Sequence, residues 1–213
     1  MLCQAMAEPR KTSRLNAAAR RAQLIEVGRG VFAERGYEAA SVEEIADRAK
    51  ISKPIVYEHF GGKEGLYAVV VDREMERVVT RMTEAIATGS PRERLERAAL
   101  AFLSYVKEEP DGFAVLTRDA PVAAATGGMS GLLNEVADRV SKVFVAEFTK
   151  AGYDATVAPV YAHALVGMGT FVGQWWTETG KPSVEEVSSH ITALAWMGLR
   201  HLPKDPRLSI ETR

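Results

Sequence analysis

Residues 41–63 constrain the fold more than any other part of the chain, because they read as two short helices joined by a tight turn and followed by a third. Ser41 is placed to cap the first helix, and Glu44 follows three residues later, as in a capping box. Pro54 lies in the first turn of the second helix, where its missing N–H has no intrahelical partner to lose. Two helices joined in this way cross steeply, so the second stands out from the surface and can enter a DNA major groove. DNA binding is therefore the leading interpretation.

The outer side of that second helix supports the same interpretation. Val56 and Phe60 are four residues apart and are expected to point inward. The outer side then carries basic, apolar and aromatic groups together: Lys53, Ile55, Tyr57 and His59. An exposed isoleucine can meet a thymine methyl group, and the other side chains can reach phosphates or base edges.

Lys63 gives a separate argument. It begins the next helix, directly after Gly61 and Gly62, and a cation there opposes the helix dipole at a cost of up to about 1 kcal/mol. A bound anion would remove the conflict, and a DNA phosphate is the obvious candidate. The alternative is a solvated lysine with little energetic consequence.

Residues 16–66 resemble the DNA-binding domain of the TetR family of transcriptional regulators. The segment Arg21–Tyr37 is similar to the first helix of that family, with Phe32 expected to be buried and Gly36 expected to end the helix. Pro54 and Ile55 stand where a small residue and a threonine are more usual, so the base preference cannot be carried over. The resemblance and the outer face together give this predicted DNA-contact set: Ser41, Ser52, Lys53, Pro54, Ile55, Tyr57, His59 and Lys63.

Charge is distributed unevenly along the chain. The net charge is −1, but residues 1–63 hold 11 Lys and Arg against 8 Asp and Glu, and the rest is net acidic. Residues 1–15 are interpreted as a basic arm that adds salt-sensitive affinity for phosphates, the alternative being an unstructured tail. No uninterrupted apolar run reaches about 18 residues, so no membrane span is expected. Cys3 is the only cysteine, which with the lack of a secretory signal favours a cytoplasmic location.

The rest of the chain predicts helices and no strands. Apolar periodicity indicates helices over about 63–88, 91–109, 112–119, 131–150, 155–179 and 183–201, with a loop over 120–131. We therefore predict an all-α fold in three parts: the basic arm at 1–15, a three-helix helix-turn-helix DNA-binding domain at 16–62, and a larger helical ligand-binding and dimerisation domain at 63–213.

The last two long helices are expected to mediate homodimerisation. Large apolar residues recur at three- and four-residue steps among Gly167, Gly169, Gly173 and Gly198, and small residues beside aromatic ones suit a self-complementary interface. The family resemblance implies a four-helix bundle from these two helices of each subunit. One short recognition helix also reads few base pairs, so two copies on a palindromic operator are expected. The alternative is a purely intramolecular core.

A small hydrophobic ligand is the expected effector. It would shift the population of dimers whose spacing fits DNA. The candidate pocket residues are Phe102, Tyr105, Phe113, Leu116, Leu133, Phe144, His163, Met168, Phe171 and Trp175, with Met129 and Phe148 as further candidates. Residues of these types are more often plain core, and for His163 a hydrogen-bonded core position is the default.

Enzymatic activity is not expected, because the four histidines are scattered and no metal-ligand spacing, nucleophile elbow or phosphate-binding glycine loop occurs. No cofactor and no metal are expected. The preferred function is a ligand-responsive regulator, most often a repressor, that binds double-stranded DNA. The alternative is a DNA-binding protein that is ligand-independent or non-specific, and strong salt sensitivity without sequence preference would favour it.

Overall fold

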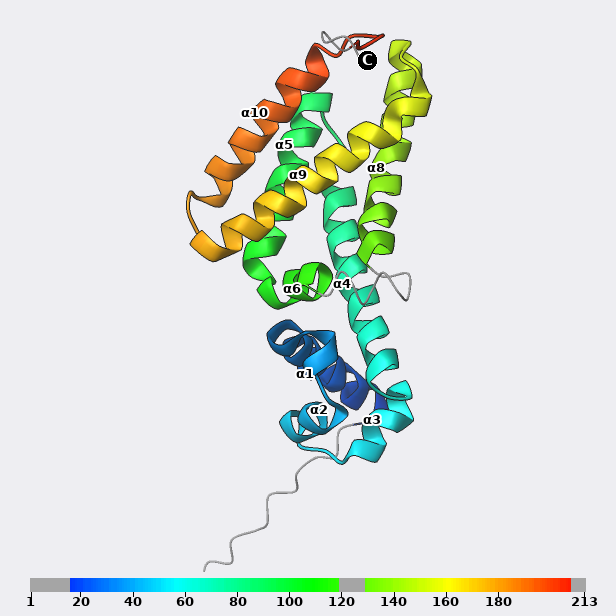
Figure 1. The fold of residues 1–213 in the computed structure, drawn as a ribbon, viewed down its shortest axis with the longest axis vertical. Helices are drawn as coiled ribbons and strands as arrows, with labels where there is room; N and C mark the ends of the chain where they lie inside the picture. Colours follow the sequence, from blue (N-terminus) through cyan, green and yellow to red (C-terminus); the bar gives the residue numbers. More distant parts are fainter. Residues whose placement is uncertain (1–15, 119–128, 208–213) are drawn as a thin grey trace, which may run out of the picture.

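A computed structural model describes residues 16–118 and 129–207, and within these residues the fold is all-α (Figure 1). The chain order is α1 (Ala17–Ala39), α2 (Val42–Ala49), α3 (Lys53–Phe60), α4 (Lys63–Ala85), α5 (Pro91–Glu108), α6 (Pro110–Arg118), α8 (Met129–Ala151), the 3-10 helix η1 (Ala155–Val157), α9 (Ala158–Thr179) and α10 (Val184–Arg200). The all-α, two-part architecture predicted from the sequence is confirmed. The predicted basic arm at 1–15 and most of the predicted loop at 120–131 lie outside the described residues.

The break expected between the helices at 91–109 and 112–119 is present, but the second of these helices starts earlier than expected. Helix α6 begins at Pro110 itself rather than at residue 112, because proline suits the first turn of a helix and the Phe113 N–H bonds the Glu109 carbonyl at 3.0 Å. Only Glu109 therefore separates α5 from α6. Likewise, α8 begins at Met129, inside the segment expected to be a loop.

Helices α1 to α3 form a small unit with its own apolar core at the lower end of the molecule in Figure 1. Gly36 takes a φ of 77° and breaks the regular helix of α1, as expected from the sequence. At Gly28 an added Cβ would lie 2.9 Å from a Leu66 methyl group, so this glycine lets α1 pack closely on α4. The fully buried side chains of this core include Leu24, Val31, Phe32, Ile45, Val56 and Leu66.

Two helices contribute to both ends of the molecule. Leu66 and Val70 of α4 lie in the N-terminal core, whereas Met75 and Val78 lie in the core of the C-terminal bundle. Helix α6 also contributes to both cores, because Val115 packs in the N-terminal core and its neighbour Leu116 packs in the C-terminal one. The two parts of the molecule are therefore joined by packing as well as by the chain.

Helix α9 presents an unusual surface. By length and composition alone, the segment Ala155–Thr179 could cross a membrane. An 18-residue stretch within it has a mean hydropathy of 1.3, and only 17% of that stretch is buried in the fold. Polar residues such as His163 and Gln174 interrupt the segment, so it is not one of the uninterrupted apolar runs on which the expectation of no membrane span rests. Its exposed side carries Val160, Phe171 and Trp175, and the neighbouring α10 exposes Leu194 and Met197.

Candidate nucleic-acid interface

Helix α3 is held so that one side is buried and the other is open. Val56 is fully buried in the N-terminal core, and Phe60 lies under the guanidinium of Arg21, 4.5 Å from the ring centre. At Gly65 an added Cβ would lie 1.9 Å from the Phe60 carbonyl oxygen, so α4 can begin directly against the end of α3 only because residue 65 is glycine. Figure 1 shows α3 at the end of the molecule that is farthest from α10.

The open side of α3 carries most of the residues predicted to contact DNA. Lys53, Pro54 and Tyr57 are exposed, and the Tyr57 side chain is 54% accessible. His59 is half-buried, with its ring tilted against Phe60. A two-turn helix with an exposed tyrosine and lysine offers both a stacking and a charged group to a partner.

Ile55 departs from the prediction of an outward side chain. It is half-buried and packs against the N-terminal core, because it lies only one residue, or about 100° of helix rotation, from the buried Val56. Part of its apolar surface remains on the edge of the exposed face.

The two serines predicted at this interface have different local roles. Ser41 caps α2, since its Oγ accepts a hydrogen bond from the Glu44 N–H at 3.1 Å, as the sequence indicated. Ser52 is exposed and occupies the N-cap position of α3, but its side chain makes no capping bond there. Lys50 ends α2 in the left-handed conformation with a φ of 55°, at a position where glycine is more usual.

Lys53 is balanced by an acidic neighbour. Its ammonium group pairs with the Glu43 carboxylate of α2, and this hydrogen bond holds the pKa of Glu43 below its ordinary value. Both side chains are largely exposed, so the pair adds little to stability. A phosphate that approaches Lys53 would compete with Glu43 for the same ammonium.

Lys63 has an intramolecular partner that the sequence did not suggest. Its ammonium donates to the carbonyl oxygens of Tyr37 at 2.9 Å and Glu38 at 3.3 Å, and lies 4.4 Å from the centre of the Tyr37 ring. A cation favours the carbonyl end of a helix, and here the end of α1 lies beside the start of α4. The two carbonyl oxygens therefore compensate the unfavourable position of the Lys63 cation at the start of α4. Only the third proton of the ammonium group is left to bind a phosphate.

A group of charged side chains lies between the DNA-binding unit and the bundle, and the sequence analysis missed it. Glu74 of α4 has a side chain only 3% exposed, and it accepts hydrogen bonds from the Tyr105 hydroxyl at 3.0 Å and from Arg77 at 3.1 Å. Arg29 of α1 reaches Glu74 at 3.5 Å and Glu109 at 2.7 Å. The sequence does carry a signal for it: Glu74 lies four residues after Val70 and four before Val78, so a charged residue falls on the apolar side of α4.

The protonation chemistry of this group follows from burial and neighbouring charge. Burial and the Glu74 carboxylate raise the pKa of the Tyr105 hydroxyl, which therefore stays protonated as a donor. Burial alone would raise the pKa of Glu109, but the hydrogen bond from Arg29 and the charges of Arg77 and Arg29 hold it below its ordinary value.

The predicted ligand residues lie in different environments within the described part of the chain. Tyr105, Phe113 and Leu116 are buried, and Phe102 packs against them. Phe144 packs edge-to-face on Phe148 of the same helix, Met168 of α9 is half-buried, and the side chain of Leu133 lies outside the described residues.

Three other predicted ligand residues are exposed. Phe171 is 75% accessible and Trp175 lies on the same exposed side of α9. His163, for which a core position was the simplest expectation, is also exposed and joins α9 to α8, with Nε2 3.2 Å from the Asn134 Oδ1. The assignment of these residues to a ligand pocket stays a prediction.

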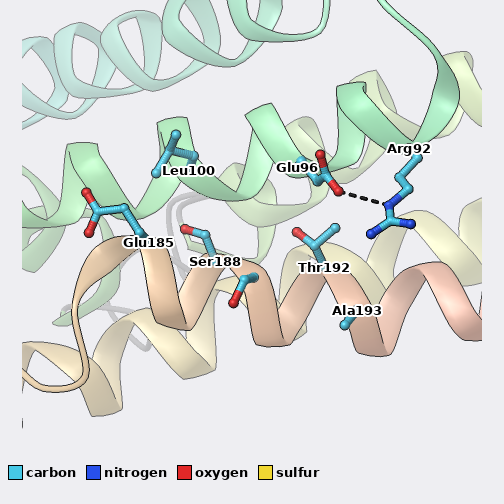
Figure 2. A pocket seen from close by; sticks show the side chains of 8 residues that line it. Arg92, Glu96, Leu100, Glu185, Ser188, Thr192 and Ala193 are labelled. Atoms are coloured by element: carbon cyan, nitrogen blue, oxygen red, sulfur yellow. Dashed lines mark hydrogen bonds and ion pairs between the residues drawn. The ribbon is translucent and has the colours of Figure 1, made fainter.

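A groove of about 270 Å³ does occur elsewhere, between α5 and α10. Figure 2 shows its lining, with the Arg92–Glu96 ion pair of α5 facing Ser188 and Thr192 of α10. None of the predicted ligand residues line it. Within residues 16–118 and 129–207 there is no cluster of three or more His, Cys, Asp or Glu side chains placed to hold a metal ion.

Comparison with known proteins agrees with this geometry. Residues 24–70 match the family described as bacterial regulatory proteins of the tetR family, and residues 91–198 match the tetracyclin repressor-like C-terminal domain. The HTH-type transcriptional activator FasR of Mycolicibacterium smegmatis is 30% identical over 202 residues, which cover 91% of this chain and 89% of FasR.

Solved structures give the same result. The crystal structure of a TetR-like transcriptional regulator from Rhodococcus sp. RHA1 superposes with a TM-score of 0.73 at 31% identity, covering 88% of this chain and all of that one. The ketosteroid transcriptional regulator KstR2 of Mycobacterium tuberculosis shares the fold, with a TM-score of 0.66 at 22% identity over 89% of this chain and 98% of KstR2. With a helix-turn-helix unit and a C-terminal bundle that each match their family counterparts, this chain belongs to the TetR family of transcriptional regulators.

Proposed function

We propose that this regulator binds a palindromic operator as a homodimer through α3 and is released from it by a small hydrophobic molecule. The observation that carries the proposal is the exposed face of α3, where Tyr57 and Lys53 are open while Val56 anchors the helix from behind. The proposed DNA-contact face comprises Ser41, Ser52, Lys53, Pro54, Tyr57 and His59, with the edge of Ile55 and the remaining donor of Lys63 beside it.

Selection of tight binders from random double-stranded DNA with the purified full chain tests this proposal. We expect a winner made of two inverted half-sites about 34 Å apart or a multiple of that distance. Tight binding that ignores sequence and collapses with salt would instead favour the non-specific alternative.

The exposed apolar surface of α9 and α10 supports the homodimer. Gly167 and Gly198 have no atom within 4 Å of an added Cβ, so nothing within the described chain explains a glycine inside either helix. Each costs about 1 kcal/mol of helix propensity, which close approach of a second copy would offset. Gly173 differs, because an added Cβ there would lie 3.2 Å from the Phe113 ring of the same chain.

The ligand is proposed to enter the apolar cluster around Phe102 of α5 and Phe113 and Leu116 of α6. A molecule that separates α6 from α5 would disturb both cores, because α6 packs in each of them. Apolar compounds of graded size should raise the melting temperature and weaken operator binding together. A panel that changes neither would argue against a hydrophobic effector.

The sequence favours repression, but FasR, which matches 91% of the chain, is named an activator, so activation is a second candidate. Rv3405c, which is named a repressor, matches over 77 residues. A reporter driven by the selected operator decides between them: expression rises on deletion of the regulator if it represses and falls if it activates.

The remaining assignments follow from this function. We propose the basic arm at 1–15, the DNA-binding domain at 16–62 and the ligand-binding and dimerisation domain at 63–213 as the functional divisions, and a cytoplasmic location where the chromosome is accessible. The family is one of transcriptional regulators, not of enzymes.

A further inference from the structure

Arg29 links the DNA-binding unit to the junction of two bundle helices. It stands in α1, and its Nη1 lies 2.7 Å from an oxygen of Glu109, the single residue between α5 and α6. The Arg29 side chain is 18% exposed, so this charge-assisted bond is only partly screened by water. The two bonded residues are 80 positions apart in the chain.

Arg29 has carboxylates on more than one side. Arg29 and Arg77 face Glu74 and Glu109, each arginine lies within 3.5 Å of both carboxylates, and Arg29 also pairs at 3.1 Å with the half-exposed Glu26 of its own helix. Without Arg29, Glu74 would keep Arg77 and the Tyr105 hydroxyl, so the buried carboxylate would not be stranded. Loss of Arg29 should therefore loosen the attachment of α1 while the fold persists.

Helix α6 sits directly on this charged group. At Gly112 an added Cβ would lie 2.1 Å from a Glu74 oxygen and 2.7 Å from the Tyr105 hydroxyl, so the backbone of α6 touches both. Movement of the α5–α6 junction therefore moves the Glu109 carboxylate to which Arg29 is bonded. Because α1 carries α2 and α3 through the shared N-terminal core, the movement reaches the DNA-contact face.

We propose that Arg29 is a positioning residue for DNA recognition, which sets the angle of the α1–α3 unit against the bundle and thereby the operator half-site spacing that the dimer accepts. This inference rests on the proposed function as a dimer on a palindrome. In a two-fold dimer a shift of one α3 is matched by its partner, so the separation of the two helices changes by twice the shift. A shift of about 1.7 Å in each copy equals one base pair of about 3.4 Å.

The test measures binding of the full-length protein to the selected palindrome with its spacer shortened or lengthened by one and by two base pairs. For the wild type we expect affinity to fall about tenfold for each base pair away from the best spacing. Arg29→Met should flatten this dependence to about threefold and weaken binding at the best spacing. Glu109→Gln keeps the shape of the side chain, removes its charge, and should give the same flattened profile.

Arg81→Met is the matched control. Arg81 bonds Glu108 at 2.8 Å and joins α4 to α5, and both of these residues belong to the bundle helices. The Arg81→Met substitution removes a similar ion pair that does not involve α1, so this variant should keep the dependence of affinity on spacer length seen in the wild type. A general loss of rigidity would flatten the profile of this variant as well, and that result would overturn the assignment to Arg29.

The outcomes separate the two proposals. A wild type with a sharp spacing preference, together with folded Arg29→Met and Glu109→Gln proteins that keep it, overturns this inference and leaves the proposed function intact. A wild type that selects no symmetric sequence overturns the proposed function, and this inference with it.

Discussion

Phe171→Ala is the sharpest test of the proposed dimer surface. The Phe171 side chain is 75% exposed on α9, so its removal should leave the fold of the single chain unchanged. Burying a phenylalanine fully is worth about 1.5–3 kcal/mol, so covering the exposed three-quarters at an interface is worth about 1–2 kcal/mol. A two-fold axis repeats the loss in the partner, which gives about 2–4 kcal/mol per dimer.

That loss corresponds to a rise in the dimer dissociation constant of about 30- to 1,000-fold. Sedimentation velocity over a range of protein concentrations measures it directly, and operator binding should weaken in parallel at low concentration. Phe171→Leu keeps most of the apolar surface and should lose far less. Val143→Ala, another exposed apolar position but on α8 rather than on α9 or α10, should behave as the wild type.

The reasoning is refuted if Phe171→Ala dimerises within about threefold of the wild type. The exposed stripe of α9 would then need another explanation, such as a different protein partner. Circular dichroism melting of each variant guards against an unfolded sample, because an exposed truncation should change stability by less than about 0.5 kcal/mol.

Four further substitutions test the site and its support. Gly112→Ala should lower stability by about 1–3 kcal/mol, because the new methyl group displaces the Glu74 carboxylate. Gly30→Ala is its control: the new methyl group meets no atom within 4 Å, so stability should rise by about 0.5–1 kcal/mol. Urea unfolding compares the two variants, and equal shifts in unfolding free energy would contradict the packing at Gly112. Lys63→Met should cost about 1 kcal/mol of unfolding free energy by removing the bonds to the end of α1, and an unchanged urea midpoint would contradict this. Tyr57→Ala should leave the melting temperature nearly unchanged yet weaken operator binding about tenfold, and unaltered affinity in a gel-shift titration would place the contact face elsewhere.

Much of the DNA-binding unit was predictable because its signals are local. The Ser41 cap, the inward Val56 and the break at Gly36 each depend on neighbours within about four residues, which is the range that helix periodicity covers. A glycine inside a helix is costly, so Gly28 points to a close approach, and the structure shows one with Leu66 of α4. No contact explains Gly30, in the sequence or in the structure.

Sequence reasoning fails where a polar side chain can bond either to a neighbour in its own helix or to a group that is distant in the sequence. Ser52 stands at the N-cap position of α3, but position in sequence does not fix where a hydroxyl points, and its side chain makes no capping bond. Lys63 looked unsatisfied because only its own helix was considered, whereas its carbonyl partners lie 26 and 25 residues earlier. The tertiary fold supplied the compensation that local reasoning assigned to DNA.

The ligand residues illustrate a deeper limit. Apolar periodicity identifies which side of a helix avoids water, but it cannot distinguish a core from an interface or a pocket, because all three are equally apolar. Tyr105 and Phe171 carried the same sequence signal, yet one is fully buried with its hydroxyl bonded to Glu74 and the other is open.

Glu74 shows why the connection between the two parts of the molecule had to come from the structure. A buried carboxylate is costly unless it is paired and hydrogen-bonded, so its position on the apolar side of α4 implies partners but does not name them. Those partners are Arg77 on the same helix, Tyr105 on α5 and Arg29, which is 45 residues earlier in the chain. Because one of them belongs to the DNA-binding unit, the need to satisfy a single buried charge holds α1 against the bundle. An apolar residue at position 74 would have packed without demanding Arg29, and the two parts would then have been joined by less directional contacts.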